Sequence, residues 1–142
     1  MRDTKGKLAA LGEGELFRHL DRRTLERLAT LATEVEIDAG TVLCEQGRVA
    51  QECWVVLSGQ ADVTVRGAQV ATIGEGETIG EMGLLDHLPR SATVTARTAM
   101  SLLRVDSRGF HELIGDPHVS EALLEILSRR IRDLEHGRTL LS

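Results

Sequence analysis

The feature that most constrains the fold is a series of short β-prone runs between residues 34 and 106, separated by glycine-containing turns. The runs at 61–65 and 92–96 alternate apolar and polar side chains, as half-buried antiparallel strands do. Many short strands at a spacing of about 8–12 residues predict a β-sandwich or a jelly-roll barrel. The predicted strands are 35–37, 41–44, 53–57, 61–65, 69–73, 92–96 and 100–105.

A helix is predicted before the strands, and a much shorter one is predicted among them. Leucines recur at helical spacing over 22–33, and Asp21 is suited to cap that helix. Residues 1–15 are polar and glycine-containing and are interpreted as a lead-in segment. The interior stretch 81–85 has a short helical pattern. A helix N-terminus there would direct unbonded N–H groups at an anion.

The C-terminal part of the chain predicts two helices separated by a break. Ser107 is expected to cap a helix over 108–114, and Asp116 followed by Pro117 is typical of the start of a second helix, over 118–136. Apolar side chains share one face of this long helix, which could serve as a core contact, a dimer seam or a lid over a ligand. They are Val119, Leu123, Ile126, Leu127, Ile131 and Leu134.

Composition limits the classes of protein that this chain can belong to. A hydrophobic content of 42% in 142 residues is enough for the core of one domain. A net charge of −5 argues against a stand-alone nucleic-acid binder, and no apolar run is long enough to span a membrane. Cys44 and Cys53 are interpreted as reduced thiols of a cytoplasmic protein. The scattered histidines fit no metal-binding or catalytic spacing, so neither a metal nor catalytic residues are expected.

The segment 76–94 carries the strongest chemical signal. Glu81 and Arg90 stand at either end of a stretch of small and apolar residues. A carboxylate accepts hydrogen bonds from sugar hydroxyls, and a guanidinium is a fork of donors that fits a phosphate. Glycines let main-chain N–H groups approach an anion closely. The combination predicts a site for a ribose that carries a phosphate.

This segment resembles the phosphate-binding cassette of the cyclic nucleotide-binding domain family, which is shared by catabolite-type regulators, cyclic-nucleotide-dependent kinases and gated ion channels. The matching residues are Ile79-Gly80-Glu81-Met82-Gly83-Leu84-Leu85 and Pro89-Arg90-Ser91-Ala92. Ile79 stands where the family usually has phenylalanine, and the upstream Glu45-Gln46-Gly47 also fits. The resemblance covers residues 16–136, with 137–142 as a tail. It implies a mainly β fold, an eight-stranded antiparallel jelly-roll barrel with an N-terminal helix, a short cassette helix and two C-terminal helices.

The resemblance also implies a role for each residue of the cassette. Arg90 would pair with the exocyclic oxygens of a cyclic phosphate, and Glu81 would accept the ribose 2′-OH. Ser91 would add a hydroxyl near the phosphate or the purine edge. Main-chain N–H groups would complete the cradle, around Gly80, Met82 and Gly83.

Roles outside the cassette follow from the same resemblance. Val65 would line the purine base, and the C-terminal helix would close over it as a lid, with Arg130 or Leu134 as the capping residue. An equal alternative is that Arg130 snorkels to solvent with its stem buried. Family usage favours cAMP as the ligand, and cGMP is the alternative.

The function implied is that of a regulatory sensor and not of an enzyme. A phosphodiesterase would need metal ligands or an activated nucleophile, and a cupin-like metal site would need a histidine motif. The expected partners are a cyclic nucleotide and either a second copy, through the C-terminal helix, or an effector domain or protein. Neither a membrane nor a nucleic acid is expected as a partner of this chain alone. A DNA-reading helix-turn-helix would have to follow Ser142, in which case the chain would be a fragment.

Two less specific interpretations of the cassette stay open at this point. Glu81 and Arg90 could form a surface ion pair, worth about 0–1 kcal/mol. Alternatively, the domain could keep the fold but have lost ligand binding, and serve as an interaction or dimerisation module.

Overall fold

The computed structural model describes residues 21–135 as strands flanked by helices. The elements, in chain order, are α2 (Arg22–Leu31), β1 (Thr33–Ile37), β2 (Val42–Cys44), β3 (Glu52–Ser58), β4 (Ala61–Val65), β5 (Ala68–Ile73), β6 (Thr78–Ile79), α3 (Glu81–Asp86), β7 (Thr93–Ala96), β8 (Met100–Asp106), α4 (Ser107–Ile114) and α5 (Pro117–Glu135). The predicted lead-in 1–15, the tail 137–142 and the domain limits at 16 and 136 lie outside the described residues.

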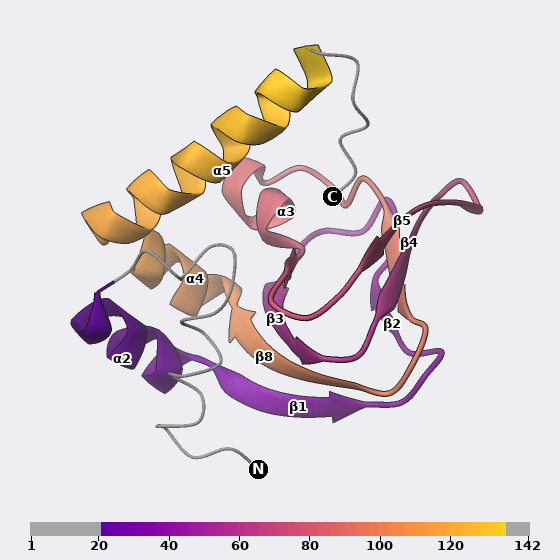
Figure 1. Cartoon of the computed structure of the whole chain (residues 1–142), viewed down its shortest axis with the longest axis horizontal. Coiled ribbons are helices and arrows are strands. Elements are labelled where there is room, and N and C mark those ends of the chain that lie inside the picture. The colour runs from indigo at the N-terminus through magenta and orange to yellow at the C-terminus, as the bar shows by residue number, and fades with distance from the viewer. Residues whose placement is uncertain (1–20, 136–142) are drawn as a thin grey trace.

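The strands form two four-stranded sheets, ordered β1-β8-β3-β6 and β2-β7-β4-β5, and every pairing is antiparallel. The helices gather on one side of these strands (Figure 1). The mainly β, eight-stranded jelly-roll architecture with flanking helices is therefore confirmed. Among residues 21–135, no helix is both long and apolar enough to cross a membrane.

The first of two apolar cores fills the space between the sheets. It takes Trp54 and Val56 from β3, Leu102 from β8 and Val94 from β7, all of them buried. These positions alternate along each strand because successive side chains of a strand point to opposite faces. Strand β3 is central to its sheet and is buried on both faces from Cys53 to Leu57.

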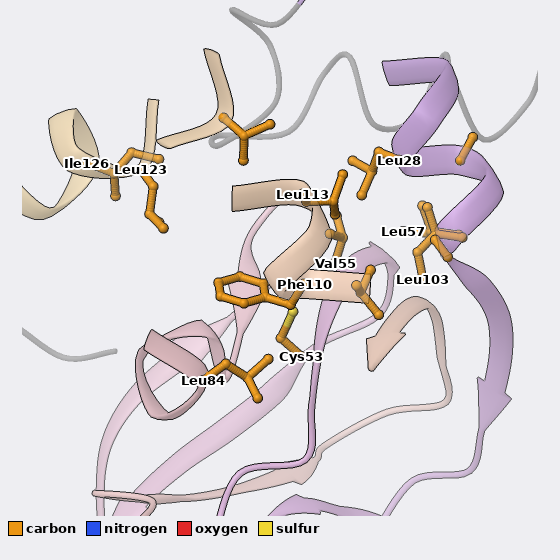
Figure 2. Close-up of a cluster of buried hydrophobic side chains, with 14 residues drawn as sticks. Leu28, Cys53, Val55, Leu57, Leu84, Leu103, Phe110, Leu113, Leu123 and Ile126 are labelled. Carbon is orange, nitrogen blue, oxygen red and sulfur yellow. The ribbon is translucent and has the colours of Figure 1, made fainter. Parts of the chain in front are cut away.

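The second core lies on the outer face of the β3–β8 sheet, under the helices (Figure 2). Cys53 of β3 packs there with Leu84 of α3, Phe110 of α4 and Leu123 of α5, and each of these side chains is at most 5% exposed. The short helix among the strands and the two C-terminal helices therefore share one continuous apolar cluster.

Most predicted boundaries agree with the structure to within one or two residues. The strand missed by the prediction is β6, whose two residues pair with Trp54 and Val55 of β3. The expected cap Asp21 is confirmed, because its carboxylate accepts a hydrogen bond from the Thr24 amide at 2.8 Å. Asp116 likewise begins α5 by accepting from the amide of His118 at 2.9 Å.

The prediction that Ser107 caps the first C-terminal helix is wrong. Ser107 is already the first residue of α4, and the N-cap is Asp106, whose Oδ1 accepts a hydrogen bond from the Gly109 amide at 2.8 Å. Both residue types suit an N-cap, so the sequence alone did not separate neighbouring candidates. The carboxylate also interacts favourably with the partial positive charge of the helix N-terminus.

We predict that Asp106→Ala lowers the free energy of unfolding by about 0.5–2 kcal/mol, the usual cost of losing an N-cap. The matched control Ser107→Ala keeps the Asp106 cap and should cost less than half as much. Urea denaturation of the two variants measures the difference. A larger loss for Ser107→Ala would contradict the assignment of the cap.

Candidate functional site

A pocket of about 270 Å³ lies between α3, the loop that follows it and β7. Its lining includes nearly every polar residue that the sequence singled out within the cassette. The lining residues are Cys44, Gly80, Glu81, Gly83, Asp86, Leu88, Pro89, Arg90, Ser91, Ala92 and Val94. The fold thus brings the two ends of the cassette, Glu81 and Arg90, to one cavity.

Arg90 is the buried cation of this pocket, with only 9% of its surface exposed. Its Nη1 donates a hydrogen bond to the carbonyl oxygen of Gly80, and its Nη2 donates to the carbonyl oxygen of Glu52 at 2.6 Å. Burying a charge is costly unless hydrogen bonds compensate. The two carbonyl groups supply that compensation and anchor two N–H groups of the guanidinium.

The main chain of Arg90 is held as firmly as its side chain. Its amide donates to the carbonyl of Arg48 at 2.7 Å, and its own carbonyl accepts from the amide of Gly47 at 2.8 Å. Gly47 has φ +88, a left-handed conformation that favours glycine. This explains the upstream glycine of the motif, because the turn it makes ties β2 to the end of the cassette.

Gly80 and Gly83 are required by close packing around Arg90. A Cβ on Gly80 would lie 2.5 Å from Nη1 of Arg90, and the residue has φ +84. A Cβ on Gly83 would lie 2.8 Å from the Cβ of Ala50. A side chain at Gly80 would therefore displace the guanidinium, and one at Gly83 would push α3 away from Ala50, just before β3.

Glu81 is the first residue of α3 and is 4% exposed, and its side chain lines the pocket. Because Glu81 and Arg90 are both buried, the surface ion pair considered above is wrong. Ser91 is exposed and also lines the pocket. Met82 contributes the next main-chain N–H group of α3, and its side chain lies outside the described residues.

The residues expected to meet a base are less well placed. Val65 is the half-buried last residue of β4 and is not among the residues that line the pocket, although β4 pairs with β7 at Thr64 and Thr93. Arg130 and Leu134 belong to α5, but their side chains lie outside the described residues. All three base contacts stay predictions.

Some residues of the site were not anticipated from the sequence. Cys44 is buried and lines the pocket, and burial raises the pKa of its thiol to about 11, so the thiol is protonated at neutral pH. Asp86 adds a second carboxylate to the lining, and its Oδ1 accepts from the Leu88 amide at 2.9 Å. The carbonyl of Glu52 carries no side-chain signal, so no residue pattern could have identified it.

Comparison with known proteins agrees with this geometry. The family model of the cyclic nucleotide-binding domain matches residues 34–116, which is more than half of the chain. The chain therefore belongs to the cyclic nucleotide-binding domain family. The match spans the strands and the whole cassette.

Individual relatives are regulatory proteins of different kinds. The chain is 37% identical over 91 residues to a cAMP-dependent protein kinase regulatory subunit of Yarrowia lipolytica, covering 63% of this chain and 24% of the relative. The catabolite activator protein of Thermus thermophilus superimposes with a TM-score of 0.78 at 28% identity, covering 87% of this chain and 61% of that one. The regulatory domain of Toxoplasma gondii PKA, crystallised with cAMP, gives 0.71 at 28% identity, with coverages of 80% and 46%. The chain thus spans about a quarter of the length of the Yarrowia relative.

We predict that Gly80→Ala weakens nucleotide binding by about tenfold or more, since displacing one charge-assisted hydrogen bond costs roughly 1.5–3 kcal/mol. Gly67→Ala is the matched control, because Gly67 has φ +82 with nothing within 4 Å of an added Cβ. Both variants should lose about 1–2 kcal/mol of stability from the left-handed backbone. Gly80→Ala should lose more than Gly67→Ala, because its Cβ also meets the Arg90 guanidinium. Urea denaturation measures both losses. Equal nucleotide affinities of the two variants would show that contact with Arg90 is not the reason for glycine at position 80.

Proposed function

We propose that this domain is a regulatory sensor that binds cAMP in preference to cGMP and transmits binding through α5. The observation that carries the proposal is the buried guanidinium of Arg90, held by two carbonyl groups at the wall of a pocket that Glu81 also lines. A buried cation fixed in this way is an anion site that needs little rearrangement before its ligand arrives.

The phosphate of a cyclic nucleotide fits the chemistry of this wall. Among residues 21–135, two guanidinium N–H groups of Arg90 donate to carbonyl groups, and its other N–H groups could donate to phosphate oxygens. Main-chain N–H groups at Gly80, Met82 and Gly83 add neutral donors at the start of α3. Glu81 and Asp86 also line the pocket, so its lining holds one arginine and two acidic residues. This balance favours a singly charged phosphodiester over a doubly charged phosphomonoester.

The ribose is assigned to Glu81. A carboxylate only accepts hydrogen bonds, so it suits a sugar hydroxyl and repels a phosphate. Glu81 is the first residue of α3, next to the N–H groups proposed to bind the phosphate. This closeness matches the short distance between the 2′-OH and the cyclic phosphate within one nucleotide.

The base is the least constrained part of the ligand. Ser91 lines the pocket and is compatible with either purine. The preference for cAMP rests on the relatives, whose names include a cAMP-dependent kinase regulatory subunit and a regulatory domain crystallised with cAMP. Val65 as the wall of the base site, and Arg130 or Leu134 as its cap, complete the proposal.

Transmission is assigned to the apolar cluster under the helices. Leu84 of α3 is 2% exposed and shares this cluster with Phe110 of α4 and with Leu123 and Ile126 of α5 (Figure 2). A shift of α3 on ligand binding would therefore reach α5 through packed side chains. The far end of α5 extends past α4 and α3 (Figure 1), and this end is the part that would close over the base.

The partner is proposed to dock on α5. Leu124 and Ile131 are 63% and 56% exposed, a large apolar area for a free helix surface. A second copy of the chain, or an effector domain or protein, would cover them. If the domain has instead lost ligand binding, it would act as an interaction or dimerisation module through this surface.

The first prediction of this proposal is that the chain binds cAMP, binds cGMP more weakly, and binds AMP at least tenfold more weakly than cAMP. Arg90→Ala should weaken cAMP binding by about 2–5 kcal/mol, as truncation of a buried charge pair does. Arg90→Lys should lose less because the charge stays, although the fork of donors is lost. Calorimetric titration at matched salt measures all five affinities, and equal binding of AMP and cAMP by the unsubstituted chain would refute the proposal.

The second prediction concerns the 2′-OH. Glu81→Ala should weaken binding of cAMP but should have little effect on binding of 2′-deoxy-cAMP, because protein and ligand changes then remove the same interaction. The four affinities form a double-mutant cycle. If the two losses were additive, Glu81 would have a role other than holding the sugar.

The third prediction concerns α5. With cAMP bound, amide protons should gain protection in α3 and in the part of α5 after Ile126. The turns of α5 up to Ile126 are already packed in the apolar cluster and should change less. Leu84→Val, a small truncation, should keep the protection of α3 and reduce that of α5. Hydrogen exchange followed by mass spectrometry measures both segments, with AMP as the control ligand. Protection confined to α3 in the unsubstituted chain would exclude the lid mechanism.

A further inference from the structure

We infer that Trp54 is a positioning residue for Arg90, whose guanidinium it holds in the direction of the pocket. This inference rests on the proposed function, because it explains how the phosphate-binding cation is kept ready for a ligand. The Cζ atom of Arg90 lies 5.9 Å from the centre of the Trp54 ring. That distance is within the range of a cation–π interaction, in which tryptophan is the strongest partner.

The register of the sheet places the indole at this point. Trp54 pairs with Ile79 of β6, and the carbonyl of the next residue, Gly80, accepts a hydrogen bond from Arg90. The other carbonyl acceptor, Glu52, lies two residues before Trp54, at the start of β3. The guanidinium is thus held from β3 and from the start of the cassette. Two carbonyl groups accept hydrogen bonds from its N–H groups, and the indole lies near its Cζ atom.

A second hollow explains why the guanidinium needs this contact. A cavity of about 560 Å³ is lined by Arg90, Glu52 and Trp54, among others, and the nucleotide pocket is lined by Arg90 but not by Trp54. Arg90 therefore separates two open spaces. Glu45 and Glu52 also line the second hollow, and each is already paired with another arginine, Arg48 and Arg104 respectively. The indole therefore adds the attraction that keeps the guanidinium at the wall between the two spaces, where it stays within reach of a phosphate in the nucleotide pocket.

The burial of both groups makes the contact effective. Trp54 is 4% exposed and Arg90 is 9% exposed, so water screens their attraction little. A desolvated cation–π contact is stronger than one at the surface. If Trp54 only filled space, a ring of the same shape with a less negative face would serve equally well. If Trp54 positions Arg90, such a ring would hold the guanidinium less well.

The test uses the fact that the chain contains one tryptophan. Incorporation of mono-, di- and trifluorinated tryptophan alters position 54 alone and weakens the electrostatic attraction of the ring face with small changes of shape. We expect the affinity for cAMP to fall stepwise, reaching about 3- to 10-fold for the trifluorinated ring, with little change in the melting temperature. Trp54→Phe should retain more affinity than Trp54→Leu, because phenylalanine keeps a weaker π face.

A second readout needs no nucleotide. The Nε–H signal of Arg90 in ¹⁵N-resolved spectra should be displaced by the indole ring current and should move towards the position of a free arginine as fluorination increases. Binding of cAMP that is equal across the fluorinated series, or an Arg90 signal that does not respond to it, would overturn the inference. If the unsubstituted chain bound no cyclic nucleotide, the proposed function would fail, and the Arg90 signal alone would still decide whether Trp54 positions the side chain.

Discussion

The site depends on one buried cation. The guanidinium of Arg90 has lost most of its contact with water, and the cost of burying it would be several kcal/mol without compensation. Carbonyl groups of Gly80 and Glu52 provide that compensation, and they come from segments far apart in sequence. Satisfying this one charge therefore fixes the cassette against β3, and the pairing of Arg90 with Gly47 and Arg48 fixes it against the turn after β2.

Strand β3 connects the site to the rest of the domain because both of its faces are buried. Trp54 faces the barrel interior, where Arg90 lies, whereas Cys53 and Val55 face the cluster under the helices. A change at the cassette can thus act on the helices in two ways, through Leu84 of α3 or through β3 itself. The first route is the more movable, since α3 is a short helix between two residues, Gly80 and His87, in left-handed conformation, whereas β3 is hydrogen-bonded on both sides.

The sequence predicted what is encoded by local pattern. Strand alternation, glycine turns and the caps at Asp21 and Asp116 are local, and the structure has them where the pattern placed them. The two-residue strand β6 has too few residues to show a period. The cap was placed at Ser107, one residue late, because serine suits an N-cap as well as aspartate does. The cassette motif identified Glu81 and Arg90, and the pocket brings them together. The carbonyl of Glu52 and the ring of Trp54 depend on strand register, which no single motif contains.

A site built before its ligand arrives has a consequence for signalling. Because Arg90 is already held, little of the binding free energy is used to order it, and the remainder can change another equilibrium. If α5 transmits binding as proposed, that other equilibrium is the position of α5. Its first turns are buried through Val119 and Ile126, while Leu124 and Ile131 are exposed. In the proposal, α5 both covers the base and presents exposed apolar side chains to a partner. The ligand and the partner would then compete for this helix or share it. Any effect of the nucleotide on a partner then equals the effect of the partner on nucleotide affinity, because such coupling is reciprocal.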